Sequence, residues 1–195
     1  MANCLIETDR LRLRPLGPDD VDRLHRLLTG AGVRKYLLDD EVIPRERAVA
    51  FVEISMASFE ADGYGLWGVL PKDSDALIGF CGFWRFHEPP RLELLYGLGE
   101  DHWHQGFATE VATKMIRYGF DTLSFERVEA STDAPNAASV AVMERAGMTF
   151  WKRELSNGLD TIYYAIDAPV LERAGTAIDG RAARLDPAVA RRRSG

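Results

Sequence analysis

Two short segments carry the residue types best suited to chemistry on a phosphorylated ligand. The first, Trp103–Glu110, reads Trp-His-Gln-Gly-Phe-Ala-Thr-Glu and places Gly106 at the start of a helical pattern, directly after a strand-like run. The second, Asn136–Ser139, begins thirty residues after Gly106. A glycine turn that opens a helix presents several backbone N–H groups to an anion, and the helix dipole favours the negative charge. The first segment therefore predicts a binding turn for a phosphorylated cofactor.

Glu93 is the carboxylate most suited to general base catalysis. It lies in a run, residues 92–98, whose other members are nearly all apolar. Strand alternation places Glu93, Leu95 and Gly97 on one face, and the other face carries Leu92, Leu94, Tyr96 and Leu98. Apolar residues on both faces indicate a central, doubly covered strand, in which burial raises the pKa of a carboxylate. We therefore expect Glu93 to accept a proton directly or through a water.

Glu93 also has a structural alternative: a partly exposed glutamate, or one paired with a neighbouring arginine, Arg91 or Arg127.

The other titratable side chains are less suited to act as a base or a nucleophile. The histidines at 87, 102 and 104 fall in expected loops or at a strand end, and Cys81 is flanked by apolar residues. No group of histidines and cysteines has metal-ligand spacing, so the sequence predicts no metal.

Strand and helix patterns show what must position these residues. Leu11–Arg14 alternates with period two, an amphipathic helix is expected from Pro18 to Thr29, and a second helix begins after Pro44 and runs toward Phe59. Residues 31–43 are expected to form a loop and a short turn. The remaining expected strands are 65–70, 77–86, 92–98, 127–132, 148–154 and 160–166. One remaining helix starts at Phe107, and the other, capped by Asn136, runs from Ala137 to Ala146. Because a helix connects strand 92–98 to strand 127–132, the two should run parallel.

Composition places the chain among ordinary globular proteins. Its 195 residues are 46% hydrophobic, enough for one α/β domain, expected over residues 1–167. Residues 168–195 are expected to form a tail that is partly helical or disordered. The longest apolar run is too short to cross a bilayer. The two cysteines lack disulfide spacing and the N-terminal residues lack a signal-peptide pattern, so a cytoplasmic protein is predicted.

Charge is unevenly distributed. Residues 1–178 carry nine more acidic than basic side chains, whereas residues 179–195 carry five arginines against two aspartates. An acidic body argues against nucleic-acid binding and fits a positively charged substrate such as an amine. The basic tail is expected to be a solvated terminus, so neither nucleic acid nor membrane is predicted as a partner.

The order of these elements and motifs over residues 5–167 resembles the GNAT acyltransferase superfamily, which binds acetyl-coenzyme A. The chain looks most like the ribosomal-protein-type, RimJ/RimL-like N-acetyltransferases. Three features carry that likeness: the opening Thr8–Pro15, the strand Glu93–Tyr96, and the turn Trp103–Glu110 followed by Asn136 and Ser139. The resemblance implies a mixed, mostly antiparallel central sheet of six to seven strands with flanking helices. It also implies a parallel strand pair that splays at the coenzyme site.

The resemblance also implies roles for individual residues. The pyrophosphate should contact the turn residues His104, Gln105, Gly106, Phe107, Ala108 and Thr109, and the pantetheine arm should pair near Gly97 and Leu98. Asn136 should contact the coenzyme, and Ser139 should donate a proton to the departing thiol or, alternatively, only bond a backbone carbonyl. The tyrosine often used as proton donor in this superfamily falls at Met143, which cannot donate one.

These features predict an N-acetyltransferase that moves an acetyl group from acetyl-CoA to a primary amine by direct transfer in a ternary complex. Deprotonating an alkylamine at pH 7 costs about 4 to 5 kcal/mol, whereas releasing a thiolate costs only about 2, so a base matters more than an acid. The alternative is a non-catalytic acyl-CoA-binding sensor. A peptide N-terminus, a polyamine and another small amine all remain open as acceptors, as do monomer and homodimer. Acceptor selection is expected from residues 31–43 and 155–160.

Overall fold

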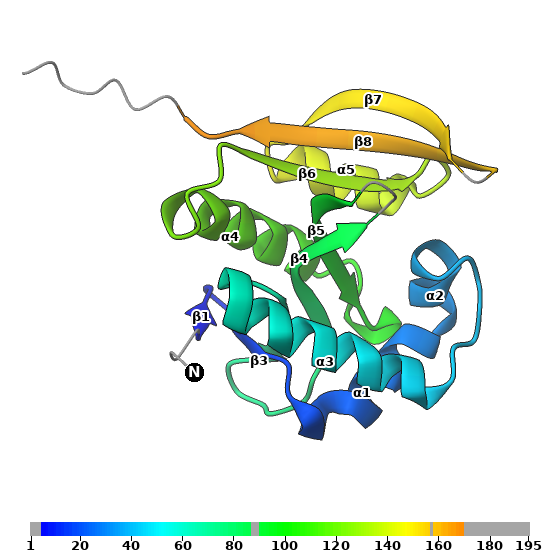
Figure 1. Cartoon of the computed structure of the whole chain (residues 1–195), viewed down its shortest axis with the longest axis vertical. Coiled ribbons are helices and arrows are strands. Elements are labelled where there is room, and N and C mark those ends of the chain that lie inside the picture. Colours follow the sequence, from blue (N-terminus) through cyan, green and yellow to red (C-terminus); the bar gives the residue numbers. More distant parts are fainter. Residues whose placement is uncertain (1–4, 87–89, 157, 170–195) are drawn as a thin grey trace, which may run out of the picture.

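The computed structural model describes residues 5–86, 90–156 and 158–169 (Figure 1). His87 and nearly all of the expected C-terminal tail lie outside the described residues. The helices are α1 (Val21–Thr29), α2 (Ala31–Leu37), α3 (Arg45–Asp62), α4 (Phe107–Asp121) and α5 (Ala137–Arg145). The strands are β1 (Ile6–Glu7), β2 (Leu11–Pro15), β3 (Leu66–Pro71), β4 (Gly79–Phe86), β5 (Arg91–Leu98), β6 (Arg127–Asp133), β7 (Thr149–Ser156) and β8 (Leu159–Asp167).

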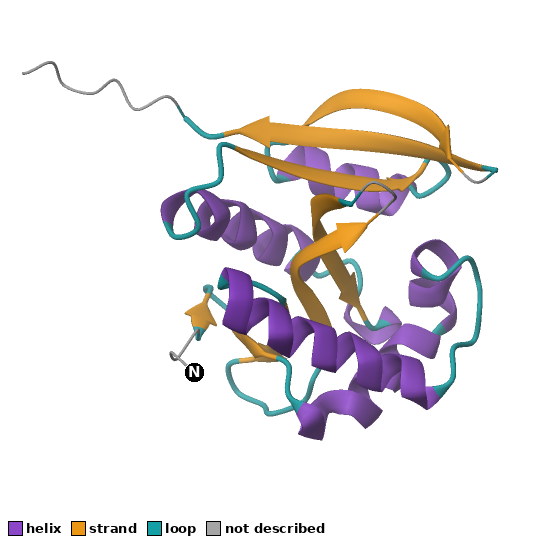
Figure 2. Cartoon of the chain, in the orientation of Figure 1, coloured by secondary structure: helices purple, strands orange, loops and turns teal. Residues whose placement is uncertain are grey.

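The strands form two sheets, as Figure 2 shows. Strands β1 to β5 pair antiparallel in chain order, and β6, β8 and β7 form a three-stranded antiparallel sheet. The mixed α/β class and the mostly antiparallel pairing are confirmed. The difference from the expected single sheet is that the ladder is interrupted between β5 and β6, so the described strands divide five and three.

Strands β5 and β6 nevertheless lie side by side. Leu92 and Val128 line one small cavity near the start of both strands, and Glu93 contacts Ser131 further along. From the first contact to the second, the residue number rises along β5 and also along β6. The two strands therefore run parallel, as the connection through α4 predicts. The expected splay is therefore present, and it leaves the β5 edge that faces β6 without ladder hydrogen bonds.

Two apolar clusters cover opposite faces of the five-stranded sheet. One contains Leu94, Leu98 and the α4 residues Val111 and Met115. The other joins residues of α1, α2 and α3 to Phe80 and Leu95. Strand β5 is therefore covered on both sides, as its double-faced apolar pattern predicts.

The helices agree with their sequence patterns except at α2. Helix α3 buries Ala48 and Val52 and continues to Asp62, three residues past the expected end, where Gly63 adopts φ 77°. The expectation of a loop across residues 31–43 is wrong for its first part, which forms α2 and buries Val33. A seven-residue segment containing a glycine has weak intrinsic helix preference, so packing against the core, which local sequence does not show, stabilises this helix.

Candidate active site

The turn before α4 has the geometry of an anion site. Gly106 is the N-cap of α4 with φ 79°, a left-handed conformation that favours glycine, and no side chain caps the helix. Among the described hydrogen bonds, the N–H groups of Phe107, Ala108 and Thr109 have no acceptor. Three such groups at the positive end of a helix fit a pyrophosphate. His104 also has positive φ, 59°, a strained conformation for a residue other than glycine.

An ion pair fixes this turn to the N-terminal segment. The Arg10 guanidinium bonds Glu110 Oε2 through Nε at 2.7 Å and the Gln105 carbonyl oxygen through Nη1 at 2.9 Å. Arg10 also lies over the Phe107 ring at 4.4 Å, and Thr8 Oγ1 donates to Glu110 Oε1 at 2.6 Å. The opening motif of the sequence therefore positions the turn.

Trp103 fixes the other end of the turn. Its indole N–H donates to the Leu98 carbonyl oxygen at 2.8 Å, and its ring lies directly against Gly32 of α2. A Cβ on Gly32 would stand 2.2 Å from the Trp103 ring, so only glycine fits there. The Leu98 carbonyl retains a second lone pair for a pantetheine amide.

Glu93 is buried and lies beside the gap between the sheets. Its side chain is 1% exposed, which excludes the partly exposed glutamate considered from the sequence. Ser131 Oγ of β6 donates a hydrogen bond to Glu93 Oε2 at 2.5 Å. Tyr163 of β8 is also close to Glu93. Burial raises the pKa of the Tyr163 phenol, and the negative charge of Glu93 raises it further. The carboxylate is thus enclosed between β5, β6 and β8.

Tyr96 and Ser139 form a second polar contact across the gap. Their hydroxyl oxygens lie 2.9 Å apart, and the Tyr96 O–H also reaches the Ser139 carbonyl oxygen at 3.2 Å. Burial raises the pKa of Tyr96 to about 12, so its phenol remains protonated at neutral pH. Asn136 fixes this turn of α5, because its Oδ1 accepts from the Ser139 N–H at 3.2 Å and its Nδ2 donates to Thr132 Oγ1 at 2.9 Å.

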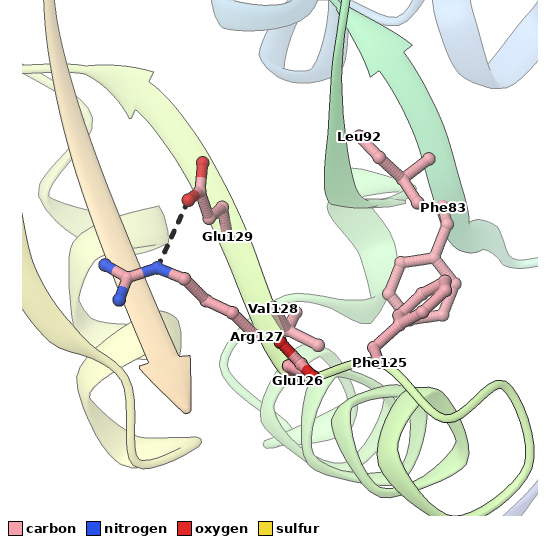
Figure 3. Close-up of a pocket in the computed structure, with 7 residues that line it drawn as sticks. All are labelled: Phe83, Leu92, Phe125, Glu126, Arg127, Val128 and Glu129. Atoms are coloured by element: carbon pink, nitrogen blue, oxygen red, sulfur yellow. Dashed lines mark hydrogen bonds and ion pairs between the residues drawn. The ribbon is translucent and has the colours of Figure 1, made fainter. Parts of the chain in front are cut away.

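Two cavities border strand β5. The smaller, about 140 Å³, lies near the starts of β5 and β6 and is drawn in Figure 3, with Arg127 bonded to Glu129 at 3.2 Å. The larger, about 280 Å³, lies between helices α1 to α3 and strands β4 and β5. Only the larger is lined by Leu95, which shares its strand face with Glu93.

The remaining candidates stay outside this arrangement. Cys81 is fully buried, and burial raises the pKa of its thiol, so it lies in the core as expected. His102 lies in a single 3-10 turn, Glu100–His102, before Trp103. Within the described residues, no group of three His, Cys, Asp or Glu side chains is arranged to hold a metal. No helix in the described part of the chain is long and apolar enough to cross a membrane.

Two contacts of the candidate site are not predicted by the sequence pattern. Tyr96 belongs to the apolar face of its strand, and no pattern singles out Ser131. The alternation does place Tyr96 on the face opposite Glu93, but which helix end covers that face depends on tertiary packing. The signal available for Ser131 was a serine inside a strand expected to run beside that of Glu93.

Comparison with known proteins identifies the family. Residues 10–149 match the model of the acetyltransferase (GNAT) domain. The chain belongs to the GNAT acetyltransferase family. This GNAT protein is an acetyl-CoA-dependent acyltransferase. It is 32% identical over 150 residues to an uncharacterised N-acetyltransferase, p20, of Bacillus licheniformis, across 76% of this chain and 83% of the relative.

Solved structures share the GNAT fold. The acetyltransferase from Salmonella typhimurium that modifies the N-terminal serine of ribosomal protein L7/L12 superposes with a TM-score of 0.71 at 19% identity, covering 85% of this chain and 99% of the other. The microcin C7 self-immunity acetyltransferase MccE, solved with acetyl-CoA and AMP, gives 0.68 at 20% identity, covering 82% and 93%. The ribosomal-protein branch that the motifs resemble is thus among the structural neighbours.

Proposed function

We propose that this GNAT protein transfers an acetyl group from acetyl-CoA to a primary amine, directly within a ternary complex, with Glu93 as general base. The observation that carries the proposal is the buried Glu93 carboxylate at the gap between β5 and β6, with its Ser131 partner. A cytoplasmic location is part of the same proposal.

The donor fits three groups of this chain. The N–H groups of Phe107, Ala108 and Thr109, which have no described acceptor, suit the pyrophosphate. The edge of β5 near Gly97 and Leu98 has no ladder hydrogen bonds to β6 and suits the pantetheine amides. His104, Gln105 and Asn136 complete the proposed contacts. Acetyl-CoA supplies an activated acyl group and a thiolate leaving group.

Glu93 removes the proton that the amine must lose. The amine lone pair forms the C–N bond, the C–S bond breaks with its electron pair on sulfur, and the products are an acetamide and a free thiol. Enclosure of Glu93 in a water-poor site strengthens its contact with the incoming ammonium group. Cys81, the cysteine in the described part of the chain, is buried in the core and so is not placed to carry the acetyl group first.

Ser139 and Tyr96 assist the departing sulfur. The two hydroxyl oxygens lie 2.9 Å apart, and either can donate to the other. In the proposed step the Tyr96 O–H donates to Ser139 Oγ, which leaves the serine hydroxyl hydrogen for the thiolate. A phenol with a pKa of about 12 is a weaker acid than a thiol with a pKa of about 8.5, so a hydrogen bond rather than complete proton transfer is favoured. The thiolate then takes its proton from water. Tyr96 supplies a hydroxyl where Met143, buried at 1% exposure, has none.

A turnover screen tests this proposal. Purified protein is incubated with acetyl-CoA and a panel of peptides with free N-termini, polyamines and small amines, and both thiol release and the mass of the amine product are followed. The proposal expects acetylated amine and free thiol in equal amounts. Tight acetyl-CoA binding by calorimetry with no product from any amine would overturn it in favour of the acyl-CoA sensor.

A further inference from the structure

The larger cavity has a lining that is almost wholly apolar. It is lined by eleven described side chains of α1, α2, α3, β3, β4 and β5 and of Leu38, which directly follows α2. Four are aromatic and one is basic: Leu24, Leu28, Leu37, Leu38, Arg47, Phe51, Leu66, Phe80, Trp84, Phe86 and Leu95. None of these described lining residues is acidic. Its volume of about 280 Å³ corresponds to roughly nine water molecules, below the usual range for a drug-sized ligand.

Strand register places this cavity beside the proposed base. Trp84 of β4 is the direct cross-strand partner of Glu93, and Leu95 is two residues further along β5. Directly paired residues and residues two apart in one strand point to the same sheet face, with paired Cβ atoms about 5 Å apart. Trp84, Leu95 and Glu93 therefore share one face, and Glu93 lies next to two residues that line the cavity.

The side chains around the cavity can stabilise one ammonium group but not two. Glu93 is an anionic partner for the reacting nitrogen, and the Trp84 ring adjacent to it offers a face that attracts a cation. Among the described lining residues the charged one is Arg47, whose Nη1 lies 2.9 Å from Glu41 Oε2. A second ammonium inside the cavity would meet apolar walls and the Arg47 cation, without a carboxylate among the described lining residues to offset its desolvation.

We propose that the acceptor is a primary amine attached to one bulky apolar or aromatic group, which fills this cavity while the nitrogen reaches Glu93. The proposal rests on the acetyltransferase function above and narrows it: polyamines and aminoglycosides, with their several charges, are excluded as good acceptors. A free arylalkylamine and the first residue of a peptide present the same chemistry, so both belong in the test.

Kinetics with matched amines test the acceptor class. The rate constant kcat/KM is measured for ethylamine, n-butylamine, phenethylamine, 1,4-diaminobutane and spermidine. We expect kcat/KM to rise about fourfold for each buried methylene, and n-butylamine to exceed 1,4-diaminobutane at least tenfold. Equal or faster use of 1,4-diaminobutane would overturn the proposal. Tetrapeptides that begin with Phe or Asp serve as the second arm. Preference for the Phe peptide supports the class with a peptide source, use of phenethylamine with neither peptide acetylated supports it with a free amine as the source, and equal acetylation of the two peptides contradicts it.

A pair of variants in α3 links the preference to the cavity. Phe51→Ala removes a lining ring, and Ile54→Ala changes an exposed residue of the same helix, 53% exposed, that does not line the cavity. The preference for phenethylamine over ethylamine should fall at least fivefold in Phe51→Ala and remain in Ile54→Ala, with acetyl-CoA affinity unchanged in both. An unchanged preference in Phe51→Ala would contradict the assignment.

Binding separates this proposal from the one on which it rests. Phenethylamine is titrated into the CoA-loaded protein by calorimetry, a readout that needs no turnover. Binding that Phe51→Ala weakens, with no acetylation of any amine, would leave the cavity assignment intact and overturn the acetyltransferase proposal. Acetylation of ethylamine, 1,4-diaminobutane and phenethylamine at equal rates would leave the acetyltransferase proposal intact and overturn the cavity assignment.

Discussion

The hydroxyl oxygens of Tyr96 and Ser139 lie 2.9 Å apart and join β5 to the first turn of α5 where the two sheets separate. On the other face of β5, Glu93 bonds Ser131 of β6. One strand therefore presents a carboxylate to one side of the gap and a phenol to the other. This arrangement separates the group proposed to accept a proton from the groups proposed to assist the thiolate.

Tyr96→Phe and Ser139→Ala should have similar and overlapping effects. Each removes one hydroxyl of the same pair, so each single variant should lower kcat by about tenfold, on the order of one hydrogen bond to a charged group. The double variant should be no worse than the poorer single variant, because the two hydroxyls act as one unit. Steady-state kinetics checks this, and fully multiplicative losses would show that the two groups act independently.

Gly106→Ala should weaken acetyl-CoA binding. At φ 79° a Cβ costs about 1 to 2 kcal/mol, so relaxation of the turn should lower affinity about fivefold or more by calorimetry. Gly158→Ala is the matched control, because Gly158 has φ 81° in the β7–β8 turn and nothing within 4 Å of its Cβ position. That control should lose comparable stability and keep wild-type affinity. Equal loss of affinity in both variants would argue against a specific role for the turn.

Glu110→Gln should destabilise the fold in a pH-dependent manner. Burial favours the protonated carboxyl, but hydrogen bonds from Thr8 and Arg10 outweigh it and lower the pKa of Glu110 below its ordinary value of 4.5. A depressed pKa stabilises the folded state above that value, and this contribution is lost as the pH falls through the folded-state pKa. We expect a loss of about 1 kcal/mol at pH 7 that diminishes below pH 4.5.

Chemical denaturation at several pH values measures that loss. Asp75→Asn is its control, since the Arg12–Asp75 pair involves a carboxylate with 93% exposure and should contribute less than about 0.5 kcal/mol. A Glu110→Gln effect independent of pH would contradict the ion-pair explanation.

Sequence reasoning succeeded where local patterns determine structure. The turn at Gly106, the Asn136 N-cap and the two-faced pattern of β5 depend on neighbours within a few residues, and the structure contains all three.

The rest depended on packing between distant segments. The Ser131 contact with Glu93 requires the register between β5 and β6, and the Tyr96 contact with Ser139 requires the position of α5 over β5. Helix α2 is stabilised by the close approach of Trp103 to Gly32 and by burial of Val33, across about seventy residues of sequence. Local periodicity contains none of this information.

The most direct test of the account is the pH profile of Glu93→Gln. With an alkylamine acceptor, kcat/KM should fall at least about a hundredfold, because a positioned general base contributes on that order. The limb of the profile that reports the base should disappear, while acetyl-CoA affinity by calorimetry stays within a factor of two or so of wild type. A Glu93→Gln variant with wild-type rate and an unchanged pH profile would show that Glu93 is not the base and would overturn the proposed mechanism.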